Sequence, residues 1–109
     1  MPYDKKLAER VRAVFDSEHN YTEKEMFGSL YFMVGRNMAV GVTGNDLVVR
    51  PGPINLIAAL ALPHVRPLDF TGRPMEGFVC VEPKGLVTDT SLAAWVERGA
   101  AYARSLPAK

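Results

Sequence analysis

The sequence predicts one α+β domain in which helices cover one face of a mainly antiparallel sheet. Three observations lead to this fold class. Residues 26–51 alternate like a three-stranded meander with its own turn signals. Amphipathic helical stripes lie near both ends of the chain, and a short apolar helical segment and two further strands lie between them. The expected order is α-β(3)-α-β(2)-α, a two-layer domain with a five-stranded sheet.

Length and composition fit a small soluble protein. A chain of 109 residues is expected to form one domain, residues 1–109, and to bury roughly 65% of its unfolded surface. The formal net charge of +1 argues against nucleic-acid binding driven by bulk charge. The N-terminus lacks an apolar leader, and no apolar run approaches the length of a membrane span. We therefore expect a cytoplasmic protein that does not bind membranes.

The first helix is expected from Asp4 to about Ser17, with Asp4 as its N-cap. Its apolar stripe follows the helical period and comprises Leu7, Val11, Val14 and Phe15. Residues 19–22 are predicted to form a loop. Thr22 and Glu25 fit a capping-box pattern, but a strand follows too soon for a helix to start there.

The meander consists of three predicted strands, at residues 30–34, 38–42 and 47–50. Gly35-Arg36-Asn37 and residues 43–46 separate the strands, and glycine and asparagine tolerate the positive φ angles of tight hairpin turns. Two short turns between three strands force neighbouring antiparallel pairing.

A second helix is predicted to begin at Pro53 and to end before Pro63. It is short and unusually apolar, so we expect it to be buried or covered by a partner chain. Its predicted apolar face comprises Leu56, Ile57, Leu60 and Ala61.

The last part of the chain contains two strands and a helix. Residues 65–70 are extended, and Pro67 confines them to a sheet edge or a loop. A turn at 71–74 and a strand at 77–81 follow. Residues 88–91 offer several N-caps for the closing helix. Its apolar stripe comprises Leu92, Trp95, Val96, Gly99, Tyr102, Ala103 and Leu106, and Gly99 suggests close contact with the sheet.

No catalytic or metal-binding constellation is recognisable. His19 and His64 are interpreted as surface residues because no carboxylate pair stands at a ligand spacing. Cys80 lies between two valines and is interpreted as a buried, inert thiol. The sequence therefore implies no catalytic residue, metal or cofactor.

The remaining candidates lie beside loops. Met26 and Phe27 precede a glycine at the start of the meander, and the segment from Asp69 to Met75 combines an acid, a base and large apolar groups. Arg50 and Arg73 together could hold an anion. The favoured alternative is that Arg73 pairs with Asp69 and holds its own loop. The candidate interaction surface is therefore Met26, Phe27, Arg50, Asp69, Arg73 and Met75.

Several motifs together resemble the N-terminal domain of the TfoX/Sxy competence regulators. They are a Met-Phe-Gly start, a glycine-rich meander ending in Leu-x-x-Arg, a Thr-Gly-Arg-Pro-Met turn, and a Trp-bearing final helix ending in Arg-Ser-Leu-Pro. The resemblance runs from Tyr3 to Lys109 and implies the α-β(3)-α-β(2)-α fold. The C-terminal domain of those regulators has no counterpart in this sequence, so we expect a stand-alone copy.

The resemblance implies a non-enzymatic regulatory or protein-interaction module with a protein partner, which includes the case of a homodimer. It brings no catalytic residues. A nucleic-acid-binding transcriptional regulator is the first alternative, although no basic recognition helix is evident. The second alternative is a small-ligand binder or enzyme that uses the Asp69–Met75 loop.

Overall fold

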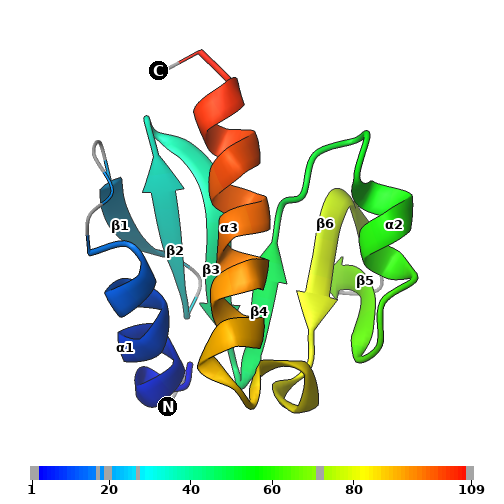
Figure 1. Cartoon of the computed structure of the whole chain (residues 1–109), viewed down its shortest axis with the longest axis horizontal. Helices are drawn as coiled ribbons and strands as arrows, with labels where there is room; N and C mark the ends of the chain where they lie inside the picture. The colour runs from blue at the N-terminus through cyan, green and yellow to red at the C-terminus, as the bar shows by residue number, and fades with distance from the viewer. Residues whose placement is uncertain (1–2, 17, 19–20, 27, 71–72, 108–109) are drawn as a thin grey trace.

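The structure is a computed structural model of the chain. It describes residues 3–16, 18, 21–26, 28–70 and 73–107, and for 68–70 and 73–76 it describes the backbone alone. The elements, in order, are α1 (Lys5–Val14), β1 (Tyr21–Met26), β2 (Ser29–Val34), β3 (Asn37–Thr43), β4 (Asp46–Val49), α2 (Leu56–Leu60), β5 (Val65–Phe70), β6 (Arg73–Val81), the 3-10 helix η1 (Pro83–Leu86) and α3 (Asp89–Ser105) (Figure 1).

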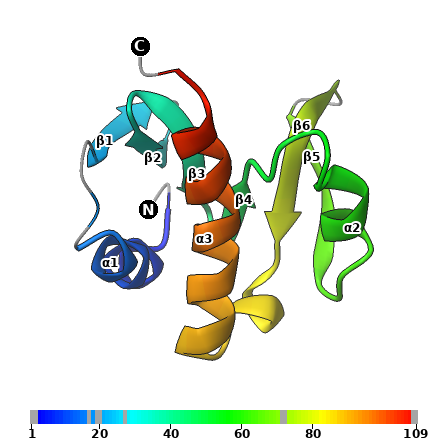
Figure 2. The same ribbon diagram turned by 45° about the horizontal axis from the view of Figure 1, so that its top comes forward.

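All described strands join one antiparallel sheet in the order β1-β2-β3-β4-β6-β5. The α+β class and the two-layer arrangement are therefore confirmed. The helices share a single core on one face of the sheet, and α3 lies over the middle of the sheet (Figure 2). Pro67 lies in β5, the edge strand opposite β1, as predicted from its missing N–H.

The strand count was wrong by one, because residues 21–26 form the additional strand β1. Tyr21 and Thr22, which were predicted to lie in a loop, pair with Val34 and Met33. β1 is a sheet edge, and most of its residues are exposed. Natural edge strands carry charged side chains that discourage pairing with other chains. Its sequence, YTEKEM, therefore lacks the apolar alternation by which the other strands are recognised.

The second helix also differs from the prediction. α2 begins at Leu56 rather than Pro53, and residues 53–55 form a turn. Ala59 is its buried residue, while Leu56 and Leu60 pack partly against the core. Ile57 was predicted on the apolar face but is 82% exposed. Likewise, β6 begins at Arg73, so Arg73 and Pro74, which were predicted to lie in a turn, belong to a strand.

The first helix is close to its prediction. Asp4 caps α1, and its Oδ1 accepts hydrogen bonds from the backbone N–H groups of Lys6 and Leu7. Val14, predicted on the buried stripe, is 37% exposed, and Ala8 is buried instead. At the C-terminal end of α1, the rings of Phe15, Tyr21 and Phe32 stack nearly parallel. This stack attaches both α1 and the edge strand β1 to the sheet.

The contact between α3 and β3 is unusually close at Gly99. A Cβ atom at this position would lie 2.2 Å from the carbonyl oxygen of Ala39 and 2.8 Å from Cγ1 of Val40. Only glycine leaves room for the two backbones. Beyond the end of α3, the Nδ2 of buried Asn37 donates a 3.0 Å hydrogen bond to the carbonyl of Pro107. The helix is thus held to β3 at its middle and just beyond its end.

We predict that Gly99→Ala destabilises the domain by about 1–3 kcal/mol, measured by urea unfolding, because α3 must move away from β3. Helix propensity alone predicts the opposite sign, a gain of roughly 1 kcal/mol.

Ala101→Gly is the matched control, because Ala101 is an exposed residue of the same helix. It is expected to cost about 1 kcal/mol through propensity alone. A Gly99→Ala variant that is more stable than the parent would show that α3 does not pack this closely.

Candidate functional site

The predicted loop residues do not form one site. Met26 ends β1 and pairs with Ser29, whereas Asp69 and Arg73 lie on the β5–β6 hairpin at the other edge of the sheet. Phe27 lies outside the described residues, and the side chains of Asp69, Arg73 and Met75 are likewise not described. The proposed pairing of Arg73 with Asp69, or of Arg73 with Arg50 around an anion, therefore remains a prediction.

Arg50 has aromatic neighbours. The guanidinium carbon lies 5.9 Å from the ring centre of Phe78 and 5.2 Å from that of Tyr102. Cation–π contacts of this kind hold an arginine where it packs. Beside it, Gly52 has a φ of +91°, and a Cβ there would lie 2.6 Å from the Tyr102 ring. Arg50 therefore fastens the segment after β4 to β6 and α3.

Sequence reasoning missed two adjoining grooves along the outer side of α3. The larger, of about 720 Å³, lies between residues 51–55 and α3, where it is lined by Ala94, Arg98 and Tyr102 among others. The smaller, of about 390 Å³, lies nearer the start of α3 and also contacts the turn after α2 and η1. Ala94 and Arg98 line both grooves. Periodicity could not reveal them because it indicates only which residues face the core.

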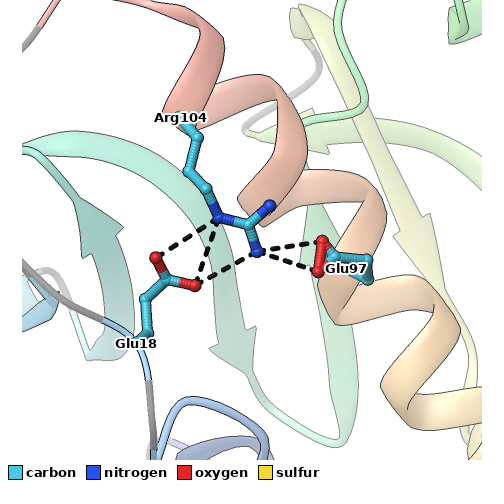
Figure 3. Close-up of polar contacts among 3 residues, drawn as sticks. All are labelled: Glu18, Glu97 and Arg104. Carbon is cyan, nitrogen blue, oxygen red and sulfur yellow. Dashed lines mark hydrogen bonds and ion pairs between the residues drawn. The ribbon is translucent and has the colours of Figure 1, made fainter.

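Several surface carboxylates are engaged by arginines. Arg104 on α3 binds Glu97 with a 2.8 Å ion pair and Glu18 with one of 3.1 Å (Figure 3). Hydrogen bonds to these two carboxylates raise the pKa of the Arg104 guanidinium above its ordinary value, and the bond to Glu97 contributes most. This network joins the last turns of α3 to the segment that follows α1.

The same use of arginines recurs elsewhere. Arg12 binds Glu23 at 2.7 Å, which links α1 to the edge strand β1. Glu23 also accepts a hydrogen bond from the hydroxyl of Tyr21. Burial and this carboxylate raise the pKa of Tyr21 above its ordinary value. These groups hold elements together, and their arrangement provides no nucleophile with an adjacent base.

Cys80 is a buried thiol, as predicted. It lies on β6, on the sheet face opposite the main core, and is 2% exposed. Burial, with a smaller contribution from the Asp46 carboxylate, raises the pKa of the Cys80 thiol to about 12. A group with this pKa remains protonated near neutral pH and is a poor nucleophile.

The described parts of the chain contain no group of three or more histidine, cysteine or acidic side chains placed to hold a metal ion. None of the helices described is both long and apolar enough to cross a membrane.

The model of the TfoX N-terminal domain family matches residues 13–103, which cover most of the chain. No curated protein and no solved structure matches the chain significantly.

We predict that Cys80 in the native protein reacts with a thiol reagent about a thousandfold more slowly than an unperturbed cysteine at about pH 8, since the thiolate fraction falls with the raised pKa. The rate should increase with pH, because the thiolate fraction increases as the pH approaches 12. The rate of labelling is measured from the absorbance of the group that the reagent releases.

Urea-unfolded protein provides the control, because unfolding should restore ordinary reactivity to the same residue. Native Cys80 labelling as fast as the unfolded chain would contradict the buried, protonated state.

Proposed function

Because the chain belongs to the TfoX N-terminal domain family, we propose that it is a non-enzymatic regulatory module that acts through protein–protein contact, with a second copy of itself as the partner. The regulatory part of the proposal rests on the resemblance to the TfoX/Sxy competence regulators. The proposed setting in the cytoplasm rests on the sequence, which has no apolar run long enough to span a membrane. The interaction part rests on the surface beside α2. A non-enzymatic role accords with the arginine–carboxylate pairs and the inert thiol described above.

The single observation that carries the proposal is an apolar ridge formed by Ile54 and Ile57. Their exposed fractions are 93% and 82%, the highest among the large apolar residues that the structure describes. Single exposed apolar residues are ordinary. Here two isoleucines stand three positions apart, and one of them, Ile54, also lines the larger groove. This is the segment whose apolar character indicated burial or a partner chain.

The ridge and the larger groove are suited to self-association. Ile54 belongs to the ridge and also lines the groove, so the protruding and hollow parts of this surface adjoin. In a two-fold dimer the same patch faces itself, so each ridge can fill the groove of the other copy.

We predict that the protein forms a dimer and that the double variant Ile54→Ser/Ile57→Ser is monomeric or dimerises at least tenfold more weakly. The two substitutions remove most of the exposed apolar area of the ridge, whose burial drives association. Sedimentation equilibrium measures the dissociation constant. A stable interface should bury more than about 1,000 Å² in total.

Val87→Ser is the matched control, because Val87 is 75% exposed but follows η1 and does not line the larger groove. This variant should dimerise like the parent, and circular dichroism should show all variants folded. A parent protein that stays monomeric at high concentration, or a double variant that dimerises unchanged, would refute self-association through this surface.

A further inference from the structure

We propose that the smaller groove beside the first half of α3 binds a small organic anion, an acidic head group carried on an apolar body. The proposal goes beyond self-association, and neither depends on the other. We name this site the anion groove.

The anion groove is assembled from three segments that are distant in sequence. The turn after α2 contributes His64, η1 contributes Lys84, and α3 contributes Trp95 and Arg98. Its volume of about 390 Å³ lies within the range of pockets that hold small organic molecules. The remaining lining is largely apolar and includes Leu62 and Val87.

The titratable side chains that line the groove are all basic or neutral. They are His64, Lys84 and Arg98, and no aspartate or glutamate is among the lining residues. Lys84 and Arg98 form no ion pair with any residue whose side chain the structure describes. The guanidinium of Arg98 lies 5.1 Å from the ring centre of Trp95, which places a cation above an aromatic wall.

The carboxylates nearest in sequence are directed to other arginines. Asp89 pairs with Arg10 at 3.4 Å, and Glu97 pairs with Arg104 at 2.8 Å. Glu82, two residues before Lys84, faces Arg66 at 3.8 Å. With these partners engaged elsewhere, the cations of the anion groove are available to an anion from solution. Arginine and lysine form their strongest hydrogen bonds with carboxylate and phosphate oxygens.

The hydroxyl groups at the groove define how an anion could be held. The Thr88 Oγ1 accepts a 3.1 Å hydrogen bond from the Ser91 N–H, so this donor of the helix end is already satisfied. The Ser91 hydroxyl donates to the Gly85 carbonyl at 2.6 Å. The Thr88 hydroxyl, which accepts the bond from the Ser91 N–H, can still donate its own proton. Lys84 and Arg98 would therefore balance the negative charge of the ligand, and Thr88 would provide an additional hydrogen-bond donor.

The backbone around the cations is firmly packed. The Glu82 N–H donates a 2.8 Å hydrogen bond to the carbonyl of His64, which has a φ of +64°. A Cβ at Gly85 would lie 3.2 Å from the Cβ of His64, so the turn and η1 are in close contact. A pre-positioned site loses less entropy on binding than a flexible one.

The apolar wall selects the body of the ligand. Trp95, which is mostly buried, lines the groove together with Leu62 and Val87, and Val87 is 75% exposed. An aromatic or aliphatic group placed against them would remove this apolar surface from water. An inorganic anion would pair with the cations but leave the apolar lining exposed to water. A neutral aromatic molecule would cover the apolar lining but leave the cations unpaired.

Trp95 is the only tryptophan in the chain and lines this groove, so its fluorescence provides a probe of binding there. The full chain would be titrated with phenyl phosphate and with benzoate, and separately with benzyl alcohol and inorganic phosphate. We expect a saturable fluorescence change with at least one aromatic anion. Benzyl alcohol and inorganic phosphate should bind at least tenfold more weakly. Phenyl phosphate and benzoate together distinguish a phosphate from a carboxylate head group.

Variants then test the residues. Lys84→Gln and Arg98→Gln should each weaken binding of the aromatic anion by about tenfold, the effect of losing one charge-assisted hydrogen bond. Lys24→Gln is the matched control, since Lys24 is an exposed cation on β1 far along the sheet from β6. Calorimetry repeats each titration, because Arg98→Gln also removes the cation above the reporter ring.

Three outcomes would overturn the proposal. They are the absence of binding by both aromatic anions in calorimetry, equal binding of benzyl alcohol, and equal losses in Lys24→Gln and Lys84→Gln. The Ile54→Ser/Ile57→Ser variant should bind the anion normally. A failure of self-association therefore leaves this result intact, and a failure of anion binding leaves the dimer test intact.

Discussion

The close contact between the backbones of α3 and β3 at Gly99 is the constraint on which the rest of the fold depends. Because Gly99 has no side chain, α3 can lie directly against β3. A Cβ atom at this position would be only 2.2 Å from the carbonyl oxygen of Ala39. The buried residues of α3, among them Leu92, Trp95 and Val96, then fill the space above the central strands. The helices α1 and α2 complete this layer on either side (Figure 2).

The outer side of the same helix carries both proposed surfaces. Ala94 and Arg98 line the anion groove and the larger groove beside the Ile54 and Ile57 ridge. Ion pairs from Arg104 to Glu18 and Glu97, and the packing of Arg50 between Phe78 and Tyr102, hold the neighbouring segments against α3. Functional side chains on such a rigid element keep their geometry better than side chains on loops.

Reasoning from the sequence identified the family and most of the fold but directed attention to other surface residues. It selected Met26, Phe27 and the Asp69–Met75 loop because they stand outside the regular pattern. The strand order places Met26 on one edge strand, β1, and Asp69 on the opposite edge strand, β5. Arg50 was a reasonable candidate for an anion site, but its aromatic neighbours on β6 and α3 lie far away in sequence. No local pattern reveals such partners.

The sequence by itself determined the features that depend on neighbouring residues. These are the Asp4 cap and the turns of the meander. The sequence also indicated an edge or loop position for the segment that contains Pro67 and a close contact of Gly99 with the sheet, and the tertiary structure supplied their partner strands, β6 and β3. Only the tertiary structure decided that the polar segment 21–26 is a strand, because pairing with β2 supplies its hydrogen bonds. It also decided that Ile57 faces outward and that Lys84 and Arg98 share a groove without a carboxylate. Those outcomes depend on contacts between distant segments, which composition and periodicity do not encode.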